Sequence, residues 1–114
     1  MTEIKIDRGG GRYQLYAKGH ACGSPEACSG VSALLYALAG WLLWKPRDVE
    51  TESCGIAQGI ADLRFSGGTA AAAAADCVTV GLLQIARAYP DAVRVTVRDT
   101  DGENDGRTGS DCEC

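Results

Sequence analysis

Hydrophobic and polar residues alternate in several short stretches of the chain, and this alternation predicts β-strands. The first two stretches are 2–8 and 12–21, and the three glycines at 9–11 between them predict a hairpin turn. Two more short strands are expected within 48–68, divided between Gly55 and Gly59 and closed by Gly67 and Gly68. The stretch 92–99 predicts a last strand, with Val93, Val95 and Val97 on one face.

A different spacing predicts a helix between the second and third strands. Hydrophobic residues recur there at intervals of three and four, namely Val31, Leu34, Leu35, Leu38 and Leu42. Pro25 and Glu26 suit the first turn of this helix, and Lys45–Pro46 ends it, because proline cannot continue a helix.

A second helix is expected from Thr69, taken as its N-cap, to Pro90. Alanines at 70–75 give it high helix propensity but little core volume. Its predicted packing face consists of Val78, Leu82, Ile85, Ala86 and Tyr89. The resulting order, ββαββαβ, predicts an α+β domain at 1–98 with a mainly antiparallel sheet and two helices.

Residues 27–44 contain no charged side chain, and a membrane span needs roughly 20 mostly apolar residues. The run is slightly short and is diluted by serine and glycine, so we expect a buried central helix rather than a membrane segment. Trp41 and Trp44 at its end are expected to be buried against the sheet or a partner subunit.

Charge is unevenly distributed along the chain. The formal net charge of the chain is −4. From Asp99 onward there are six acidic residues and one arginine, which together give −5, so the rest of the chain carries about +1. The segment 99–114 is rich in Gly and Asp and is expected to be disordered. No basic cluster is present, which argues against a nucleic-acid partner. The polar start of the chain indicates no signal peptide, so we expect a cytoplasmic protein with reduced thiols.

Cys28 and His20 are the residues best placed for chemistry. Cys28 falls near the start of the first helix, where the helix dipole favours a thiolate, and His20 lies at the end of the preceding strand. The N–H groups of Cys28 and Ser29 are candidate donors to an oxyanion. Cys54 and Cys77 have small or apolar neighbours and are expected in the core. Ser32, one turn after Cys28, is by itself equally explained as a small packing residue.

A metal site is the weaker interpretation of the same stretch. It would combine His20, Cys22 and Cys28 with Cys112 and Cys114, but structural zinc sites prefer two close cysteine pairs. We therefore expect neither a metal nor a cofactor.

The segment GHA at 19–21, followed by a short loop and CSGVSAL at 28–34, resembles the signature of the ribosomal-processing cysteine proteases, the Prp family. The later VGLLQIARAYPDAVRVTV at 80–97 is similar to the second helix and final strand of that family. The likeness extends over about residues 2–98.

The resemblance implies a cytoplasmic thiol protease, with Cys28 as nucleophile, His20 as base, Ser32 as the serine one turn later and Gly19 as a loop hinge. It also implies a homodimer that removes an N-terminal extension from a ribosomal protein, or trims a phage capsid or scaffold protein. Two alternatives stay open: a weakly active or inactive peptide-binding relative, and a thiol redox switch that uses Cys22 and Cys28.

Overall fold

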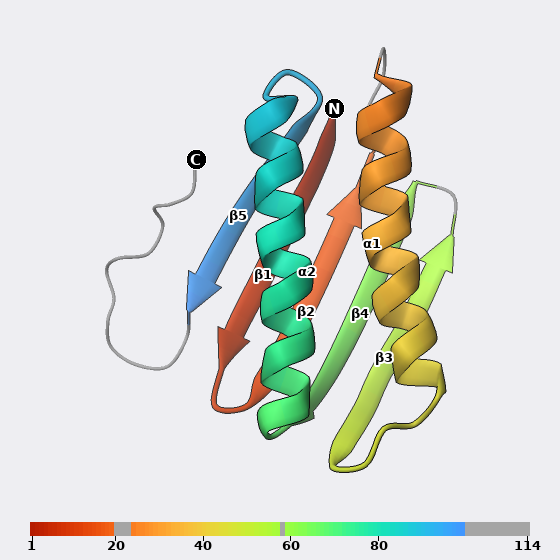
Figure 1. Ribbon diagram of the computed structural model, residues 1–114, viewed down its shortest axis with the longest axis vertical. Helices are drawn as coiled ribbons and strands as arrows, with labels where there is room; N and C mark the ends of the chain where they lie inside the picture. Colours follow the sequence, from red (N-terminus) through yellow and green to blue (C-terminus); the bar gives the residue numbers. More distant parts are fainter. Residues whose placement is uncertain (20–23, 58, 100–114) are drawn as a thin grey trace.

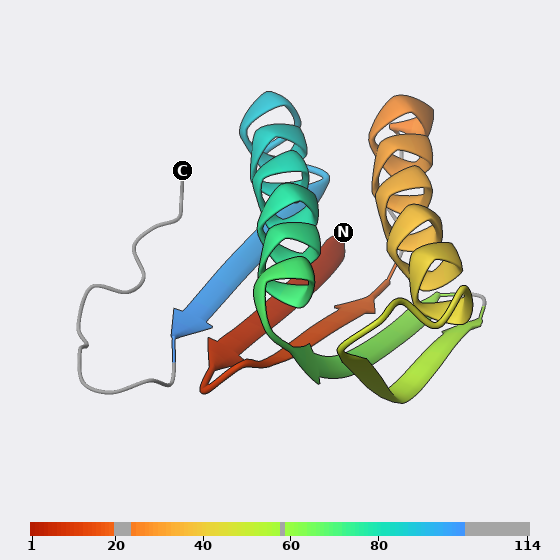
Figure 2. The same cartoon turned by 60° about the horizontal axis from the view of Figure 1, so that its bottom comes forward.

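The computed structural model describes residues 1–19, 24–57 and 59–99, in which five strands form one sheet and two helices lie on one of its faces (Figures 1 and 2). Along the chain these elements are β1 (Thr2–Gly9), β2 (Arg12–Lys18), α1 (Pro25–Leu43), β3 (Val49–Ala57), β4 (Ile60–Gly67), α2 (Thr69–Ala88) and β5 (Val93–Asp99). The order ββαββαβ and the α+β class are therefore confirmed.

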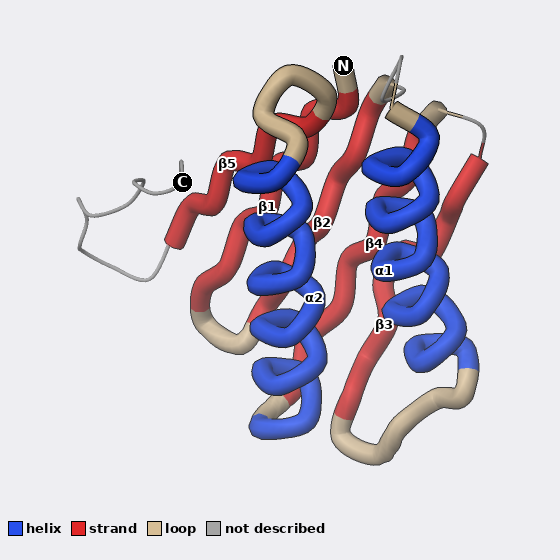
Figure 3. The backbone as a smooth tube through the Cα atoms, turned by 45° about the horizontal axis from the view of Figure 1, so that its top comes forward, coloured by secondary structure: helices blue, strands red, loops and turns tan. Residues whose placement is uncertain are grey.

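The strands lie in the order β3-β4-β2-β1-β5. The pairs β1–β2, β2–β4 and β3–β4 are antiparallel, as expected, whereas β1 and β5 are parallel. In the central register, Ile6 lies opposite Leu15 on β2 and opposite Val97 on β5. The first and last strands of the domain are thus neighbours (Figure 3).

The core lies between the sheet and the two helices. Alternate strand residues point into it, and its largest fully buried side chains include Ile4, Ile6, Leu15, Leu63 and Phe65. The rings of Tyr13 and Phe65 stack with centroids 5.4 Å apart. The outward positions of the strands are mostly polar, so the sheet has one covered and one solvent-exposed face.

Residues at the two ends of helix α1 explain where it begins and where it ends. Ser24 is the N-cap, and its Oγ accepts a hydrogen bond of 3.3 Å from the Ala27 N–H. Pro25 occupies the first helical position, where a missing N–H removes no hydrogen bond. At the other end, Lys45 has a φ of +56°, which breaks the helix just before Pro46.

The two helices approach each other through reciprocal contacts between a glycine and a large side chain. A Cβ on Gly30 of α1 would lie 2.9 Å from Ile85 Cδ1, and a Cβ on Gly81 of α2 would lie 2.8 Å from Leu34 Cδ1. By length and composition both helices could span a membrane, but in this fold each packs one side on the sheet or its neighbour. The expected core helix is confirmed for one side of α1, which buries Val31, Leu35, Leu38 and Leu42 among others.

Several details of the expected elements are wrong. The N-cap of α2 is Gly68 and not Thr69, which is already helical. The buried side of α2 consists of Ala71, Ala75, Val78, Thr79 and Leu82, whereas Tyr89 caps the helix and is exposed. Val78 and Leu82 are buried as expected, and Ile85 and Ala86 are partly buried against the core, but the predicted face left out Ala71 and Ala75.

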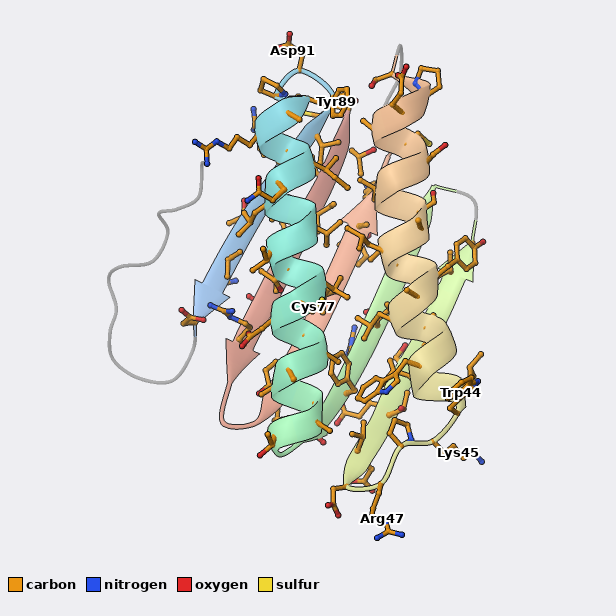
Figure 4. The ribbon with its side chains drawn as sticks, in the orientation of Figure 1. Trp44, Lys45, Arg47, Cys77, Tyr89 and Asp91 are labelled. Atoms are coloured by element: carbon orange, nitrogen blue, oxygen red, sulfur yellow. The ribbon has the colours of Figure 1, made fainter. Side chains whose placement is uncertain are left out.

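The expected burial of Cys77 in the core is also wrong. Cys77 lies on the exposed side of α2, one position out of phase with Val78 (Figure 4). Cys54 is half-buried, and its thiol donates to the carbonyl oxygen of Ala39 in α1 at 3.7 Å. Trp41 packs partly against the core, but Trp44 is exposed at the end of α1 and is not buried against the sheet. Burial of Trp44 against a partner subunit stays a prediction.

At the end of the sheet where β1 meets its turn, Arg8 joins three elements. Its guanidinium bonds Asp99 of β5 at 2.9 Å and Asp76 of α2 at 3.2 Å. The hydrogen bond with Asp99 is the main reason that the pKa of Arg8 is raised above its ordinary value.

Candidate active site

A groove of about 450 Å³ opens between the N-terminal half of α1 and the sheet. It lies at the opposite end of β1 from Arg8, where β2 ends and the β3–β4 hairpin turns (Figure 1). Gly19, Cys28 and Ser32 all line it. Three of the site residues expected from the sequence are therefore brought together, from the end of β2 and from α1.

Cys28 is the fourth residue of α1, and its side chain is half-buried. It packs partly against the core and reaches the groove from the helix side. Its backbone N–H donates to the Ser24 carbonyl oxygen at 3.1 Å. The thiol is thus fixed at the end of the first helical turn, where the field of the helix dipole is weaker than at the first residue.

This hydrogen bond corrects the expected oxyanion site. The N–H of Cys28 is used within the helix, and Ser29 lies one residue further in, where its N–H faces the carbonyl of Pro25. The Ala27 N–H already donates to Ser24 Oγ, and Pro25 has no N–H. Glu26 is the first-turn residue whose backbone N–H remains for a ligand at the helix start.

Ser32 lies one turn after Cys28, as expected, and its side chain is exposed at the rim of the groove. A packing role for Ser32 is therefore not supported. Ser29 is exposed as well but does not line the groove.

Gly19 is held firmly at the end of β2. Its N–H donates to the Gly59 carbonyl oxygen at 2.9 Å, its φ is +98°, and a Cβ would overlap the carbonyl oxygen of Met1. Glycine is required here by backbone conformation and by space. The expected hinge role of Gly19 concerns the loop that follows it, which lies outside the described residues, so this role stays a prediction.

His20 and Cys22 fall within 20–23, and Cys112 and Cys114 within 100–114, all outside the described residues. The Cys28–His20 pair, the Cys22–Cys28 redox pair and the weaker metal site therefore stay predictions. Among the described residues, no three His, Cys, Asp or Glu side chains are grouped so that they could hold a metal ion.

Sequence reasoning missed the contribution of the β3–β4 hairpin to the groove. Ile56 and Ala57 at the end of β3, and Gly59 and Ile60 at the start of β4, line its sheet side. Tyr36, one turn after Ser32, also lines it. Only the strand order, which places β4 beside β2, reveals that this hairpin faces Cys28.

The floor of the groove is apolar. Ala17, Val31, Leu35 and Ala61 form it, and all four are buried. An apolar floor with a thiol and a hydroxyl at the rim suits an extended segment that inserts an apolar side chain and presents its backbone to Cys28.

Comparison with known proteins identifies the class of fold. The chain matches the Staphylococcus aureus ribosomal processing protease Prp bound to a covalently linked product peptide, with a TM-score of 0.73 and 18% identity over 86% of this chain and 100% of the other. The same protease in complex with a substrate peptide matches with a TM-score of 0.66 and 17% identity over 86% and 100%.

A Streptococcus mutans protein, SMU.848, matches with a TM-score of 0.61 and 19% identity over 88% of this chain and 96% of the other. No protein-family model matches the chain, and no curated protein sequence does. The chain therefore has the fold of the Prp protease structures, and the resemblance expected from the sequence is confirmed at the level of the fold.

Proposed function

We propose that the protein is a cysteine peptidase that uses Cys28 as nucleophile and His20 as general base. The observation that carries the proposal is that Gly19, Cys28 and Ser32, which the sequence resemblance singles out, line one groove. His20 follows Gly19 directly in the chain, so the base is tethered to a residue at the edge of that groove. The Prp fold, known in complexes with product and substrate peptides, supports the same function.

In the proposed reaction, His20 takes the proton of Cys28, and Sγ attacks the carbonyl carbon of a peptide bond. The tetrahedral intermediate collapses, the C–N bond breaks, and the leaving amine takes the proton from His20. Water then gives a proton to His20 and adds to the carbonyl carbon of the thioester. The C–S bond of this second intermediate breaks, and the Cys28 thiolate takes the proton back from His20. The products are a free carboxylate and a regenerated thiol.

The oxyanion of the intermediate would be bound by the Glu26 N–H, since the neighbouring N–H groups are used within the helix start. Ser32, one turn away at the rim, would hydrogen-bond the backbone of the substrate. Apolar contacts with the floor of the groove would fix the residue next to the cleaved bond.

The substrate class is proposed from the resemblance. It is a protein with an N-terminal extension, either a ribosomal protein or a phage capsid or scaffold protein, processed in the cytoplasm by a homodimer. The S. aureus protease of the same fold is a ribosomal processing protease, which favours the first of these substrates.

The test combines alkylation and cleavage. Iodoacetamide labelling at each cysteine is followed by mass spectrometry across pH in the wild type and in His20→Ala. We expect Cys28 to react faster than the exposed Cys77 near neutral pH, and to lose that advantage without His20. Equal rates for Cys28 and Cys77 would contradict an activated thiol.

Cleavage is measured by intact mass on a large-subunit ribosomal protein that carries its N-terminal extension, with reductant present. We expect wild-type protein to release the extension and Cys28→Ala to leave it intact. Cleavage by Cys28→Ala at the wild-type rate would exclude the mechanism. Binding without cleavage by the wild type would favour the alternative of an inactive peptide-binding relative.

A further inference from the structure

The open face of the sheet, opposite the two helices, carries more positive than negative charge on strands β2, β1 and β5 (Figure 2). Outward residues alternate with buried ones along each strand, and the register aligns the outward residues in rows across the three strands. Three successive rows hold four positive and two negative side chains, which we call the basic face: Lys18, Glu3 and Arg94, then Lys5, then Asp7 and Arg98.

Most of the positive charge on the basic face is not neutralised by a neighbouring carboxylate. Arg98 is bonded to Asp7 at 3.3 Å. Toward the other edge of the sheet, Arg12 and Arg64 are each bonded to a carboxylate as well. Three exposed cations belong to no ion pair of the described residues, namely Lys5, Lys18 and Arg94. The unbalanced positive charge therefore lies on the side of the sheet that ends with β5.

The segment that follows β5 has the opposite charge. Residues 100–114 include five acidic residues and one arginine. The segment begins directly after Asp99, whose carboxylate is bonded to Arg8 at 2.9 Å. Because β5 is an edge strand, the acidic segment starts from a fixed point at the border of the basic face.

We propose that the acidic segment 100–114 folds back over the open side of the sheet and binds the basic face of its own chain. The length of the segment allows this. Arg94, near the start of β5, lies five residues before Asp99, which is about 17 Å along the strand. Fifteen residues span up to about 50 Å when extended, so the segment reaches every cation of the basic face.

The spacing of the charges matches as well. Acidic residues occupy every second position of 101–105, so in an extended segment their carboxylates lie on one side, about 6.6 Å apart. The outward residues of β5 recur with the same period, and Lys5 of β1 lies level with the middle one. A segment that runs back antiparallel to β5 therefore places its three carboxylates, in order, over Arg98, Lys5 and Arg94.

The covalent connection favours this occupant over a separate polyanion. A short connection gives a tethered ligand an effective concentration of about the millimolar range, so contacts that are weak between separate molecules suffice within one chain. A separate nucleic acid lacks this advantage and also meets the carboxylates of Glu3 and Asp7 on the same face. Binding by charge does not require one fixed conformation, so the proposal agrees with the disorder expected from the composition of the segment.

The first experiment is cross-linking with a water-soluble carbodiimide, which joins a lysine amine to a carboxylate in direct contact. The full chain is treated at low ionic strength with reductant present, and linked peptides of the monomer are identified by mass spectrometry. We expect several-fold more links from 101–105 to Lys5 than to Lys45, which is exposed just beyond the end of α1 (Figure 4). These links should be lost in about 1 M NaCl, where the Debye length is about 3 Å.

Equal linkage of Lys5 and Lys45 would overturn the proposal. Links that occur only in covalent dimers would overturn it too, because the segment would then occupy a second copy and not its own chain.

The second experiment compares amide NMR spectra of the wild type and of a full-length variant in which the three acids of 101–105 are neutralised: Asp101→Asn, Glu103→Gln and Asp105→Asn. We expect the signals of β1 and β5 around Lys5 and Thr96 to shift toward their positions in the wild type at high salt. The matched control neutralises the last two acids, Asp111→Asn and Glu113→Gln, and should shift these signals several-fold less.

Equal shifts in the two variants, or none in either, would contradict the proposed position of 101–105. Binding of a single-stranded RNA to the basic face, with the same affinity in the wild type and in the neutralised variant, would show that the segment does not occupy this face. Neither experiment depends on peptidase activity.

Discussion

The carbonyl oxygen of Met1 occupies the space into which a Cβ of Gly19 would project. Gly19 has a φ of +98°, and its N–H is bonded to the Gly59 carbonyl oxygen. The start of β1, the end of β2 and the β3–β4 turn are thus held together at one point beside the groove. Any side chain at position 19 would push these three segments apart.

Gly19→Ala is expected to lower the free energy of unfolding by roughly 3 kcal/mol, from backbone strain and overlap with Met1 together. The matched control is Gly10→Ala, where φ is +61° but a Cβ would meet nothing within 4 Å. Gly10→Ala therefore reports the backbone strain alone, which is expected to lower the free energy of unfolding by roughly 1 kcal/mol. Urea denaturation measures both variants, and equal losses would contradict a steric role for Met1.

Ser24→Ala removes the cap of α1 and is expected to lower the free energy of unfolding by about 1 kcal/mol. The Ala27 N–H loses its partner, so its hydrogen exchange is expected to become faster. Ser24→Asp keeps an acceptor oxygen and should restore the wild-type values. Unchanged exchange at Ala27 in Ser24→Ala would show that the cap does not hold the first turn.

Thr79→Val is expected to stabilise the protein by about 1 kcal/mol. Thr79 is buried in α2, and its hydroxyl has no hydrogen-bond partner among the described residues. Valine has nearly the same shape and no polar atom to bury. Thr79→Ala is the control, because it removes the hydroxyl together with a methyl group and should destabilise by leaving a cavity. A loss of stability in Thr79→Val, by thermal or urea denaturation, would show that the hydroxyl is satisfied.

Ser32→Trp is expected to fill the mouth of the groove and to weaken binding of a substrate peptide at least tenfold. Ser32 is exposed, so the free energy of unfolding should change by less than about 0.5 kcal/mol. Ala73→Trp, on the exposed side of α2, controls for an added indole on a helix surface. Fluorescence anisotropy with a labelled peptide measures binding, and wild-type affinity in Ser32→Trp would place the binding site elsewhere.

Most of the secondary structure is encoded locally and could therefore be predicted. In β1 and β5 every second residue is apolar, and in α1 the leucines recur every three or four residues, so each of these elements has one apolar side. The structure buries these sides. Cys77 shows where this reasoning failed. Its neighbours are apolar, but burial in a helix follows the phase, and Val78 and Leu82 fix that phase.

The groove could be predicted only in part. Cys28 and Ser32 share a helix side, which spacing alone reveals, and Gly19 precedes the same helix in the chain. Ile56 and Gly59 reach the groove because β4 pairs with β2, a long-range contact without a local signal. The sequence pattern predicted the N–H groups of Cys28 and Ser29 as oxyanion donors. This prediction is wrong because α1 begins at Pro25, early enough for the Cys28 N–H to donate to the Ser24 carbonyl oxygen.

The parallel pairing of β1 with β5 has a consequence for the order in which the chain acquires its structure during synthesis. Ile4 and Ile6 in β1 lie beside Val95 and Val97, which leave the ribosome roughly 90 residues later. Until then, one edge of β1 has unpaired N–H and C=O groups, although the β1–β2 hairpin can already form. During most of translation the nascent chain therefore has an unpaired edge on β1, and its sheet is complete only when β5 has left the ribosome.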